Sequence, residues 1–150
     1  MSDRYFGDLE SGETHVIGPR TVSKDEIVSF AQRYDPQRMH VDEEAARESQ
    51  FGTLVASGWH TGSISMRLVV DELFANVAVA GALGIDDLRW TAPVTPGDEL
   101  SGTVSVAEKN EWNDQNGLVH FDVETRNQDD ETVMTRTDLV LVERASSDSL

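Results

Sequence analysis

The sequence contains no cysteine among its 150 residues. Disulfide bonds, thiolate nucleophiles and thiolate zinc sites are therefore excluded. The four histidines do not have the mutual spacing of metal ligands, so no metal site is expected at His15, His40, His60 or His120. No apolar run approaches the roughly 18 residues that a membrane-spanning helix requires. The first residues are polar and acidic, unlike a signal peptide, and we expect a cytoplasmic protein that does not bind membranes.

Lysine is scarce, with only Lys24 and Lys109 among 12 basic residues, whereas 28 residues are acidic and the net charge is −16. Such a balance argues against a nucleic-acid groove, which needs a basic surface. An acidic surface poor in lysine would suit a salty cytoplasm, and ordinary solubility explains it equally well. Because this surface repels anions, an anionic ligand would need a local cluster of arginines.

The first third of the sequence predicts a strand followed by a short helix. Residues 1–13 have little to bury and predict a loose arm, and residues 15–22 predict a strand interrupted by Gly18-Pro19. Ser23 with a glutamate three residues later is a capping-box signature. Apolar residues then recur at helical spacing, so we expect a helix over residues 24–34.

The stretch from Tyr34 to His40 brings a carboxylate and an imidazole close together in the sequence. Pro36 disfavours helical geometry at Asp35, so the preceding helix should end there. We therefore expect Asp35 and His40 on an irregular segment that can direct both side chains into one pocket. Asp42 can cap a second short helix, over residues 43–48.

A longer helix is predicted over residues 59–74, after an approach of small residues at 51–58. Apolar residues surround this helix on almost every side, which is typical of a buried helix. Arg67 and Asp71 are spaced to form an ion pair on its surface. The small residues at its start would allow a ligand to approach its N-terminus closely.

The remainder of the sequence predicts antiparallel strands. Two apolar segments bounded by glycines precede a turn rich in proline, and three segments with alternating or apolar patterns follow. The segments are residues 77–83, 85–90, 100–106, 119–123 and 133–142, with the turn at 93–98. Residues 145–150 predict a disordered tail. The sum is an α+β fold in which a curved antiparallel sheet wraps around a long central helix. Homodimerisation would cover the exposed part of such a sheet.

Three segments of the sequence resemble the MaoC-like (R)-specific enoyl-CoA hydratases. In chain order they are Phe30-Ala31 with residues 34–46, residues 56–59 with Ser63, and residues 89–98. The first resembles the hydratase motif of the family, the second the start of its central helix, and the third its strand–turn signature. The resemblance implies a hotdog fold forming one domain over residues 1–150, and it implies no cofactor.

The resemblance also implies a mechanism. Asp35 would be the general base and His40 its partner, and together they would hold a water molecule that adds to C3 of an enoyl thioester. The reverse reaction would dehydrate a 3-hydroxyacyl thioester of CoA or of an acyl carrier protein. Backbone N–H groups near Ser57 and Gly58 would stabilise the thioester oxygen, and Ser63 matches a family serine that lines the site.

The sequence departs from the family pattern beside the two catalytic candidates. Tyr34 stands where the hydratases most often have glycine, and Gln37 and Arg38 stand where they have asparagine and proline. We expect Gln37 and Arg38 to line the substrate site and to influence substrate choice, although Arg38 also fits a solvated loop. Trp59 fits either the substrate site or an aromatic contact in the core or at an interface.

Two other functions stay open at the sequence level. A hotdog thioesterase would release free thiol from an acyl-CoA, but such enzymes generally lack an aspartate and a histidine at this spacing. The protein could also be a non-catalytic module that binds acyl thioesters, in which case Asp35 would be a turn former and His40 a structural residue.

Overall fold

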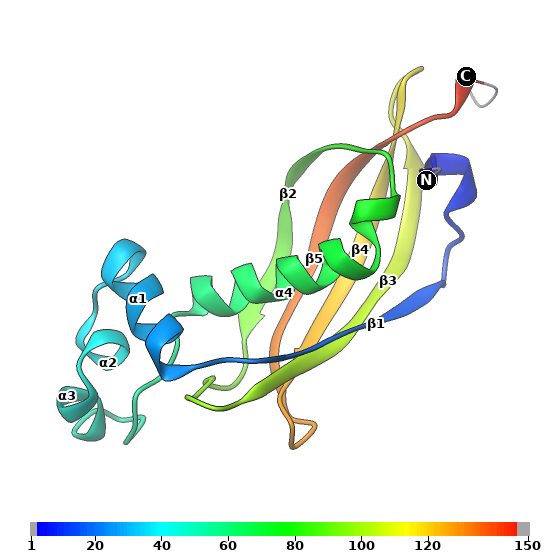
Figure 1. The fold of residues 1–150 in the computed structure, drawn as a ribbon. Helices are drawn as coiled ribbons and strands as arrows, with labels where there is room; N and C mark the ends of the chain where they lie inside the picture. Colours follow the sequence, from blue (N-terminus) through cyan, green and yellow to red (C-terminus); the bar gives the residue numbers. More distant parts are fainter. Residues whose placement is uncertain (1–2, 147–150) are drawn as a thin grey trace.

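The computed structural model describes residues 3–146, whose body is a curved antiparallel sheet of five strands (Figure 1). The strands are β1 (Thr14–Thr21), β2 (Val79–Trp90), β3 (Glu99–Glu111), β4 (Asn116–Arg126) and β5 (Thr132–Glu143). Their order in the sheet is β1-β3-β4-β5-β2, so β1 and β2 form its two edges. The α+β prediction of a curved sheet is confirmed. The two segments predicted before the proline-rich turn form one strand, β2, which accommodates irregularities in its pairing with β5.

Strand alternation determines which side chains face the core. On β4, Val119, Phe121 and Val123 are buried, and the residues between them are more exposed. On β5, Val140 and Val142 are buried in the same way. These side chains form the floor on which the central helix packs.

The central helix, α4 (Gly58–Glu72), lies across the concave face of the sheet (Figure 1). Ile64, Leu68 and Val69 bury its inner face. The prediction of a helix buried on nearly every side is wrong, because a stripe through Trp59 and the Arg67–Asp71 ion pair is exposed. A single sheet covers only one side of the helix. The helix also ends two residues earlier than predicted, and a 3-10 turn, η2 (Phe74–Asn76), follows it.

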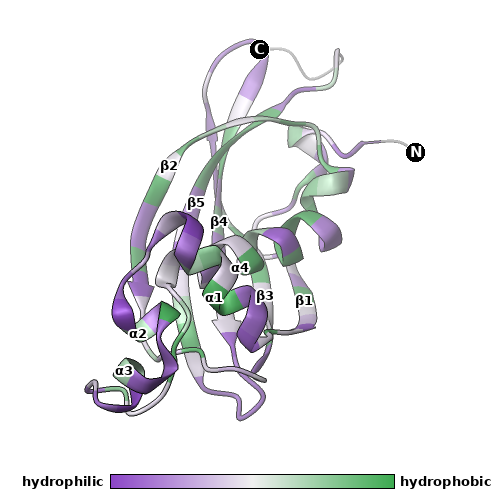
Figure 2. Ribbon diagram, turned by 60° about the vertical axis from the view of Figure 1, so that its left-hand side comes forward, coloured by the Kyte–Doolittle hydropathy of each residue, from purple (hydrophilic) through white to green (hydrophobic). Residues whose placement is uncertain are grey.

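Three short helices cluster at the N-terminal end of α4: α1 (Lys24–Tyr34), α2 (Arg38–Val41) and α3 (Glu43–Arg47) (Figure 1). Their ribbons are mostly hydrophilic in colour, with a few apolar positions (Figure 2). The predicted capping box of α1 is confirmed, with reciprocal hydrogen bonds between Ser23 and Glu26. The predicted cap of α3 is also confirmed, since the Asp42 carboxylate accepts from two backbone N–H groups.

The N-terminal arm is packed rather than loose. Phe6, in the 3-10 turn η1 (Phe6–Asp8), is 7% exposed, and Leu9 is 1% exposed. Lys109 Nζ and Arg144 Cζ lie 4.5 and 4.9 Å from the centroid of the Phe6 ring. The prediction of a loose arm is therefore wrong for residues 3–13, because these two apolar side chains fill the end of the sheet. Most of the predicted C-terminal tail, residues 147–150, lies outside the described residues.

Candidate active site

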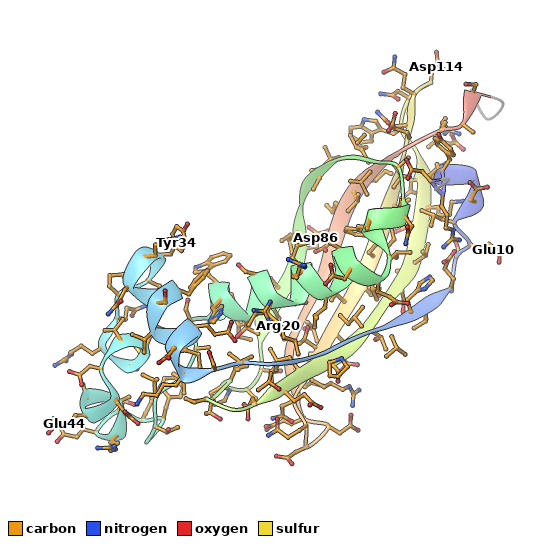
Figure 3. All side chains as sticks on the ribbon, viewed as in Figure 1. Glu10, Arg20, Tyr34, Glu44, Asp86 and Asp114 are labelled. Carbon is orange, nitrogen blue, oxygen red and sulfur yellow. The ribbon has the colours of Figure 1, made fainter. Side chains whose placement is uncertain are left out.

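Asp35 terminates α1 as the sequence predicts. Its N–H still donates to the Ala31 carbonyl at 2.8 Å, but its φ and ψ of −154° and 66° are no longer helical. Pro36 follows and prevents the helix from continuing. The carboxylate therefore projects from a helix end towards the start of α4, whereas Tyr34 is 67% exposed and points away from the molecule (Figure 3).

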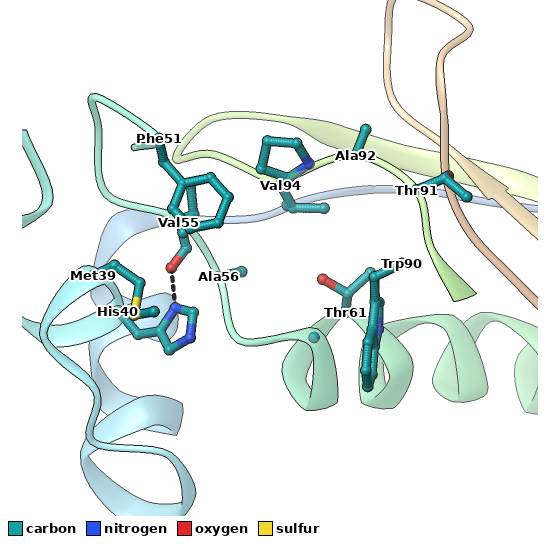
Figure 4. A pocket seen from close by; sticks show the side chains of 12 residues that line it. Met39, His40, Phe51, Val55, Ala56, Thr61, Trp90, Thr91, Ala92 and Val94 are labelled. Atoms are coloured by element: carbon teal, nitrogen blue, oxygen red, sulfur yellow. Dashed lines mark hydrogen bonds between the residues drawn. The ribbon is translucent and has the colours of Figure 1, made fainter. Parts of the chain in front are cut away.

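His40 lies on the single turn of α2 rather than on an irregular segment, and this part of the prediction is wrong. Residues 35–37 are irregular, and Gln37 then begins the turn as its N-cap. The imidazole is buried, with Nδ1 2.7 Å from the Val55 carbonyl oxygen (Figure 4). Because a carbonyl oxygen only accepts, Nδ1 carries a hydrogen. A neutral His40 therefore presents the lone pair of Nε2.

Two neighbours hold the Asp35 carboxylate. Ser57 Oγ donates to Oδ2 at 2.6 Å, and Gln37 Nε2 donates to Oδ1 at 2.6 Å. The Ser57 hydrogen bond, and then that of Gln37, lowers the pKa of Asp35 below its usual 3.8. The carboxylate is therefore ionised near neutral pH.

The two candidate catalytic groups face each other. His40 Nε2 lies 3.5 Å from Asp35 Oδ2, which is longer than a good direct hydrogen bond. Both atoms accept hydrogen bonds when His40 is neutral and Asp35 is ionised. This arrangement suits a water molecule that donates one O–H to each of them and keeps its lone pairs for an electrophile.

A cavity of about 390 Å³ lies beside His40. Its walls come from the helical cluster, the start of α4 and the end of β2 with the turn after it. The lining residues are Met39, His40, Phe51, Val55, Ala56, Gly58, Thr61, Trp90, Thr91, Ala92, Pro93 and Val94. His40 and Trp90 stand on opposite sides of it (Figure 4). Asp35 and Ser57 do not line the cavity, so His40 is the member of the pair that borders it.

Gly58 brings the N-terminus of α4 to the cavity. N–H groups in the first turn of a helix have no intrahelical acceptor. The Trp59 N–H donates to Ser57 Oγ at 3.3 Å and the His60 N–H donates to the Ser57 carbonyl at 3.0 Å, whereas the Gly58 N–H has no acceptor among the residues that the structure describes. A Cβ atom at Gly58 would lie 2.4 Å from Cε2 of Trp90. Glycine therefore allows the indole ring to pack against the helix start.

The remaining predicted site residues lie elsewhere. Ser63 donates to the Trp59 carbonyl at 2.8 Å, and both residues line a second cavity between α4 and β2. Trp59 is 61% exposed. Arg38 is also exposed and borders a surface hollow beside α3. The structure thus groups Asp35, Gln37, His40, Ser57 and Gly58, whereas the side chains of Ser63, Trp59 and Arg38 lie apart from this group.

Sequence reasoning missed three contributions to the site. The Val55 carbonyl orients His40, and no side chain at that position could have signalled it. The sequence predicts a role for the backbone near Ser57, and in the structure the Ser57 hydroxyl also holds Asp35 and caps α4. The sequence predicts that Gln37 lines the substrate site, and in the structure its amide holds Asp35. A serine directly before a helix start was the available signal for the capping role.

A long helix lying in a curved antiparallel sheet defines the class of hotdog-fold proteins, and in this one a carboxylate and an imidazole meet near the N-terminus of that helix. Residues 10–128 match the family described as MaoC like domain, and the chain belongs to this family. The prediction of this family from three short segments is confirmed.

Individual relatives agree with this assignment. The chain is 36% identical to the uncharacterised protein YdeM of Bacillus subtilis over 82% of this chain and 87% of that protein. It is 34% identical to a 3-hydroxybutyryl-CoA dehydratase of Methylorubrum extorquens over 69% of this chain and 64% of that enzyme. It is 30% identical to an (R)-specific enoyl-CoA hydratase of Rhodospirillum rubrum over 68% of this chain and 69% of that enzyme. The similarity to Protein MaoC of Klebsiella aerogenes spans only 31% of that protein.

Solved structures show the same architecture over nearly the whole chain. A monoamine oxidase regulatory protein from Archaeoglobus superposes with a TM-score of 0.90 at 30% identity, covering 97% of each chain. A MaoC-like dehydratase from Rhodospirillum rubrum superposes with a TM-score of 0.84 at 36% identity, covering 95% of this chain and 98% of the other.

Proposed function

We propose that this protein is a hydro-lyase that adds water to the C2–C3 double bond of an enoyl thioester, in the (R) sense, or removes it from a 3-hydroxyacyl thioester. The observation that carries this proposal is the 3.5 Å separation of Asp35 Oδ2 and His40 Nε2 beside the N-terminus of α4. Two acceptor atoms at this separation, close to the Gly58 N–H at the start of α4, match the needs of hydration. The family supports the reaction type, and relatives are named for both directions.

In the proposed hydration, one water molecule donates its two hydrogens to Asp35 and His40. Asp35 acts as the general base while the water oxygen bonds to C3. His40 positions the water and shares in returning the proton to C2. One proton leaves the water and one reaches C2, so the protein returns to its starting state.

The thioester oxygen gains negative charge as C3 is attacked. We assign its stabilisation to the Gly58 N–H, aided by the dipole of α4, which directs partial positive charge to this end of the helix. Ser57 and Gln37 act earlier, by keeping the Asp35 carboxylate ionised and turned towards His40. Arg38 lies apart from these residues. Its contact with the CoA or acyl carrier protein that bears the substrate is a further proposal.

The proposed substrate is an acyl thioester of CoA or of an acyl carrier protein, and the proposed reaction needs no cofactor.

We also propose a homodimer, because β2 pairs with β5 on one side only and exposes Val79, Leu83 and Ile85. An apolar edge strand of this kind is a template for pairing with a second copy.

No helix within residues 3–146 is long and apolar enough to cross a membrane. A cytoplasmic location is a further proposal, which cell fractionation tests.

The test is hydration of crotonyl-CoA, followed by the loss of absorbance of the conjugated double bond. Asp35→Asn and His40→Ala should each lower kcat by roughly a hundredfold or more, because each removes a proton acceptor from the water. Matched controls are Asp114→Asn in the turn between β3 and β4 and His120→Ala on β4, which change an exposed and a partly exposed side chain outside the cavity lining. Both controls should retain wild-type turnover.

Full turnover in either purified Asp35 or His40 variant would overturn the proposed mechanism. Release of free CoA thiol in place of hydration would instead identify a thioesterase. Thermal stabilisation by acyl-CoA without any turnover would identify a non-catalytic binding module.

A further inference from the structure

The cavity beside His40 has a polar side chain in its wall that the proposed mechanism does not yet use. Thr61, at the end of the first turn of α4, lines this cavity and is 3% exposed. Its side chain points into the space between His40 and Trp90 (Figure 4). Thr61 follows Gly58 by three residues, so the two lie on one face of the helix, and both border the cavity.

The Thr61 hydroxyl has only a long hydrogen bond within residues 3–146. Its acceptor is the Ser57 carbonyl oxygen at 3.5 Å, whereas a good O–H···O bond is about 2.7 Å long. That oxygen already accepts from the N–H groups of His60 and Thr61, at 3.0 and 3.1 Å. Because a carbonyl oxygen has two lone pairs, both are then in use. A better acceptor in the cavity would therefore stabilise the buried hydroxyl.

The other polar side chains in the cavity wall have their hydrogens in use or in contact with solvent. His40 Nδ1 and Thr91 Oγ1 each donate to a backbone carbonyl oxygen at 2.7 Å. The indole N–H of Trp90 belongs to a residue that is 44% exposed, so water can accept from it. Among the described residues of this wall, Thr61 is thus the buried side chain with a hydrogen to offer a ligand.

Thr61 Oγ1 lies close enough to the Gly58 N–H for one ligand oxygen to accept from both. The peptide that joins Ser57 to Gly58 holds the Gly58 nitrogen within about 2.6 Å of the Ser57 carbonyl oxygen. Since Thr61 Oγ1 is 3.5 Å from the same oxygen, the two donors are at most about 6 Å apart. A single oxygen that accepts at about 2.9 Å from each can span that distance.

We propose that the Thr61 hydroxyl is a second donor to the thioester oxygen, beside the Gly58 N–H. The inference rests on the proposed hydratase function and adds a catalytic residue to it. Negative charge grows on the thioester oxygen as water attacks C3, so the hydrogen bond from Thr61 strengthens in the transition state. Thr61 donates this hydrogen bond and keeps its proton, and the proton balance between water and C2 is unchanged.

The first test compares Thr61→Val with Thr61→Ser. Valine keeps the shape of the side chain and removes the hydroxyl, whereas serine keeps the hydroxyl. For crotonyl-CoA, kcat should fall on the order of a hundredfold in Thr61→Val with little change in KM, because the lost interaction belongs to the transition state. Thr61→Ser should keep most of the turnover. Wild-type kcat in Thr61→Val would overturn the proposal, and so would an equal loss in the two variants.

Thr125→Val is the matched control. Thr125 is fully buried on β4 and donates to Ser65 Oγ at 3.0 Å, but it does not line the cavity beside His40. This variant also removes a buried threonine hydroxyl and should lose stability without losing turnover. A fall in kcat as large as that of Thr61→Val would show that the effect comes from loss of any buried hydroxyl, and it would contradict the proposal.

The second test detects the hydrogen bond without turnover. Asp35→Asn should bind crotonyl-CoA without hydrating it, and the stretching frequency of a carbonyl labelled with carbon-13 can then be measured by infrared difference spectroscopy. Hydrogen bonds to a carbonyl lower this frequency. We expect a higher frequency in Asp35→Asn/Thr61→Val than in Asp35→Asn, and no change with Thr61→Ser or Thr125→Val. Equal frequencies with and without the Thr61 hydroxyl would overturn the proposal.

The inference and the proposed function fail in different ways. Hydration at the wild-type rate by Thr61→Val would remove the inference and leave the function standing. Absence of hydration with every enoyl-CoA, together with a carbonyl frequency that depends on Thr61, would remove the function and leave the contact standing. Thr61→Ala removes the same hydroxyl if Thr61→Val does not fold. A bound carbonyl in Asp35→Asn with the frequency it has in an apolar solvent would overturn the proposal without any variant at position 61.

Discussion

Ser57 is the residue through which the candidate site is held together. It is fully buried, its hydroxyl donates to Asp35, and its oxygen accepts from the Trp59 N–H at the start of α4. One side chain therefore helps to lower the pKa of the proposed base and also caps the helix that supplies the proposed oxyanion donor. His40 has a comparable anchor in the Val55 carbonyl, which fixes its tautomer.

We expect Ser57→Ala to move the acid limb of the pH–rate profile to higher pH. The Ser57 hydrogen bond is the largest cause that lowers the pKa of Asp35, so its removal raises that pKa. Asp35 acts as a base only when ionised, and activity would then be lost at a higher pH as the solution is acidified. The measurement is kcat/KM for crotonyl-CoA as a function of pH.

Ser23→Ala is the matched control for the capping role of Ser57. Ser23 caps α1 through its side chain but does not contact Asp35. Each variant should lose roughly 1 kcal/mol of stability through its lost cap. Only Ser57→Ala should shift the acid limb, and an identical shift in Ser23→Ala would contradict the assigned role.

The start of α4 is the element on which the cavity depends. Trp90, at the end of β2, packs its ring against Gly58 and meets Trp59 edge-on, with ring centroids 5.3 Å apart. The N-terminus of the helix and the wall of the cavity therefore share one contact. The contact is possible because position 58 has no side chain.

Gly58→Ala should impair hydration although alanine favours helices more than glycine. The added Cβ would lie 2.4 to 2.8 Å from atoms of the Trp90 ring, so the ring must move. We expect kcat/KM for crotonyl-CoA to fall by about tenfold or more, since displacements of about 1 Å near reacting groups have such effects. Tryptophan fluorescence should report the displaced ring.

The double variant Gly58→Ala/Trp90→Leu separates crowding from other effects of the added methyl group. A smaller side chain at position 90 restores space for the Cβ, and part of the activity should return. Wild-type kcat/KM in the single variant would show that the contact does not control the cavity.

At the scale of the whole molecule, the two edges of the sheet differ. The β1 edge exposes Val16, whereas β2 exposes several large apolar side chains over its length. The apolar colouring along the first half of β2 is visible in Figure 2. Pairing of β2 with its copy would be an isologous contact of a two-fold dimer. Each copy carries a net charge of −16, so the two copies repel each other at long range.

Leu83→Lys should convert the proposed dimer into a monomer, because it places a charge on the exposed β2 edge. Light scattering after size-exclusion chromatography measures the mass directly. Salt should strengthen the wild-type dimer, since it screens repulsion between two anionic copies. Val16→Lys makes the same change of charge on the opposite edge and should leave the dimer intact. Loss of the dimer in Val16→Lys, with none in Leu83→Lys, would assign the interface to β1.

The sequence by itself determined the features that depend on neighbouring residues. Local hydrogen bonds and sterics define three helix ends, at Ser23 with Glu26, at Asp35 before Pro36, and at Asp42 before an acidic turn. The structure has these helix ends where the sequence predicts them. Alternating patterns likewise predicted the central strands, because strand periodicity is local.

Only the tertiary structure determined which residues that are distant in the sequence contact each other. Ser57 reaches Asp35 over 22 residues, and the Val55 carbonyl reaches His40 over 15. The burial of the N-terminal arm, and the exposed stripe of α4, depend on which surfaces the sheet covers. Periodicity records how apolar a face is, but not whether another element packs on it. For that reason the sequence predicted candidate residues for the chemistry, and the fold decided which neighbours hold those residues in place.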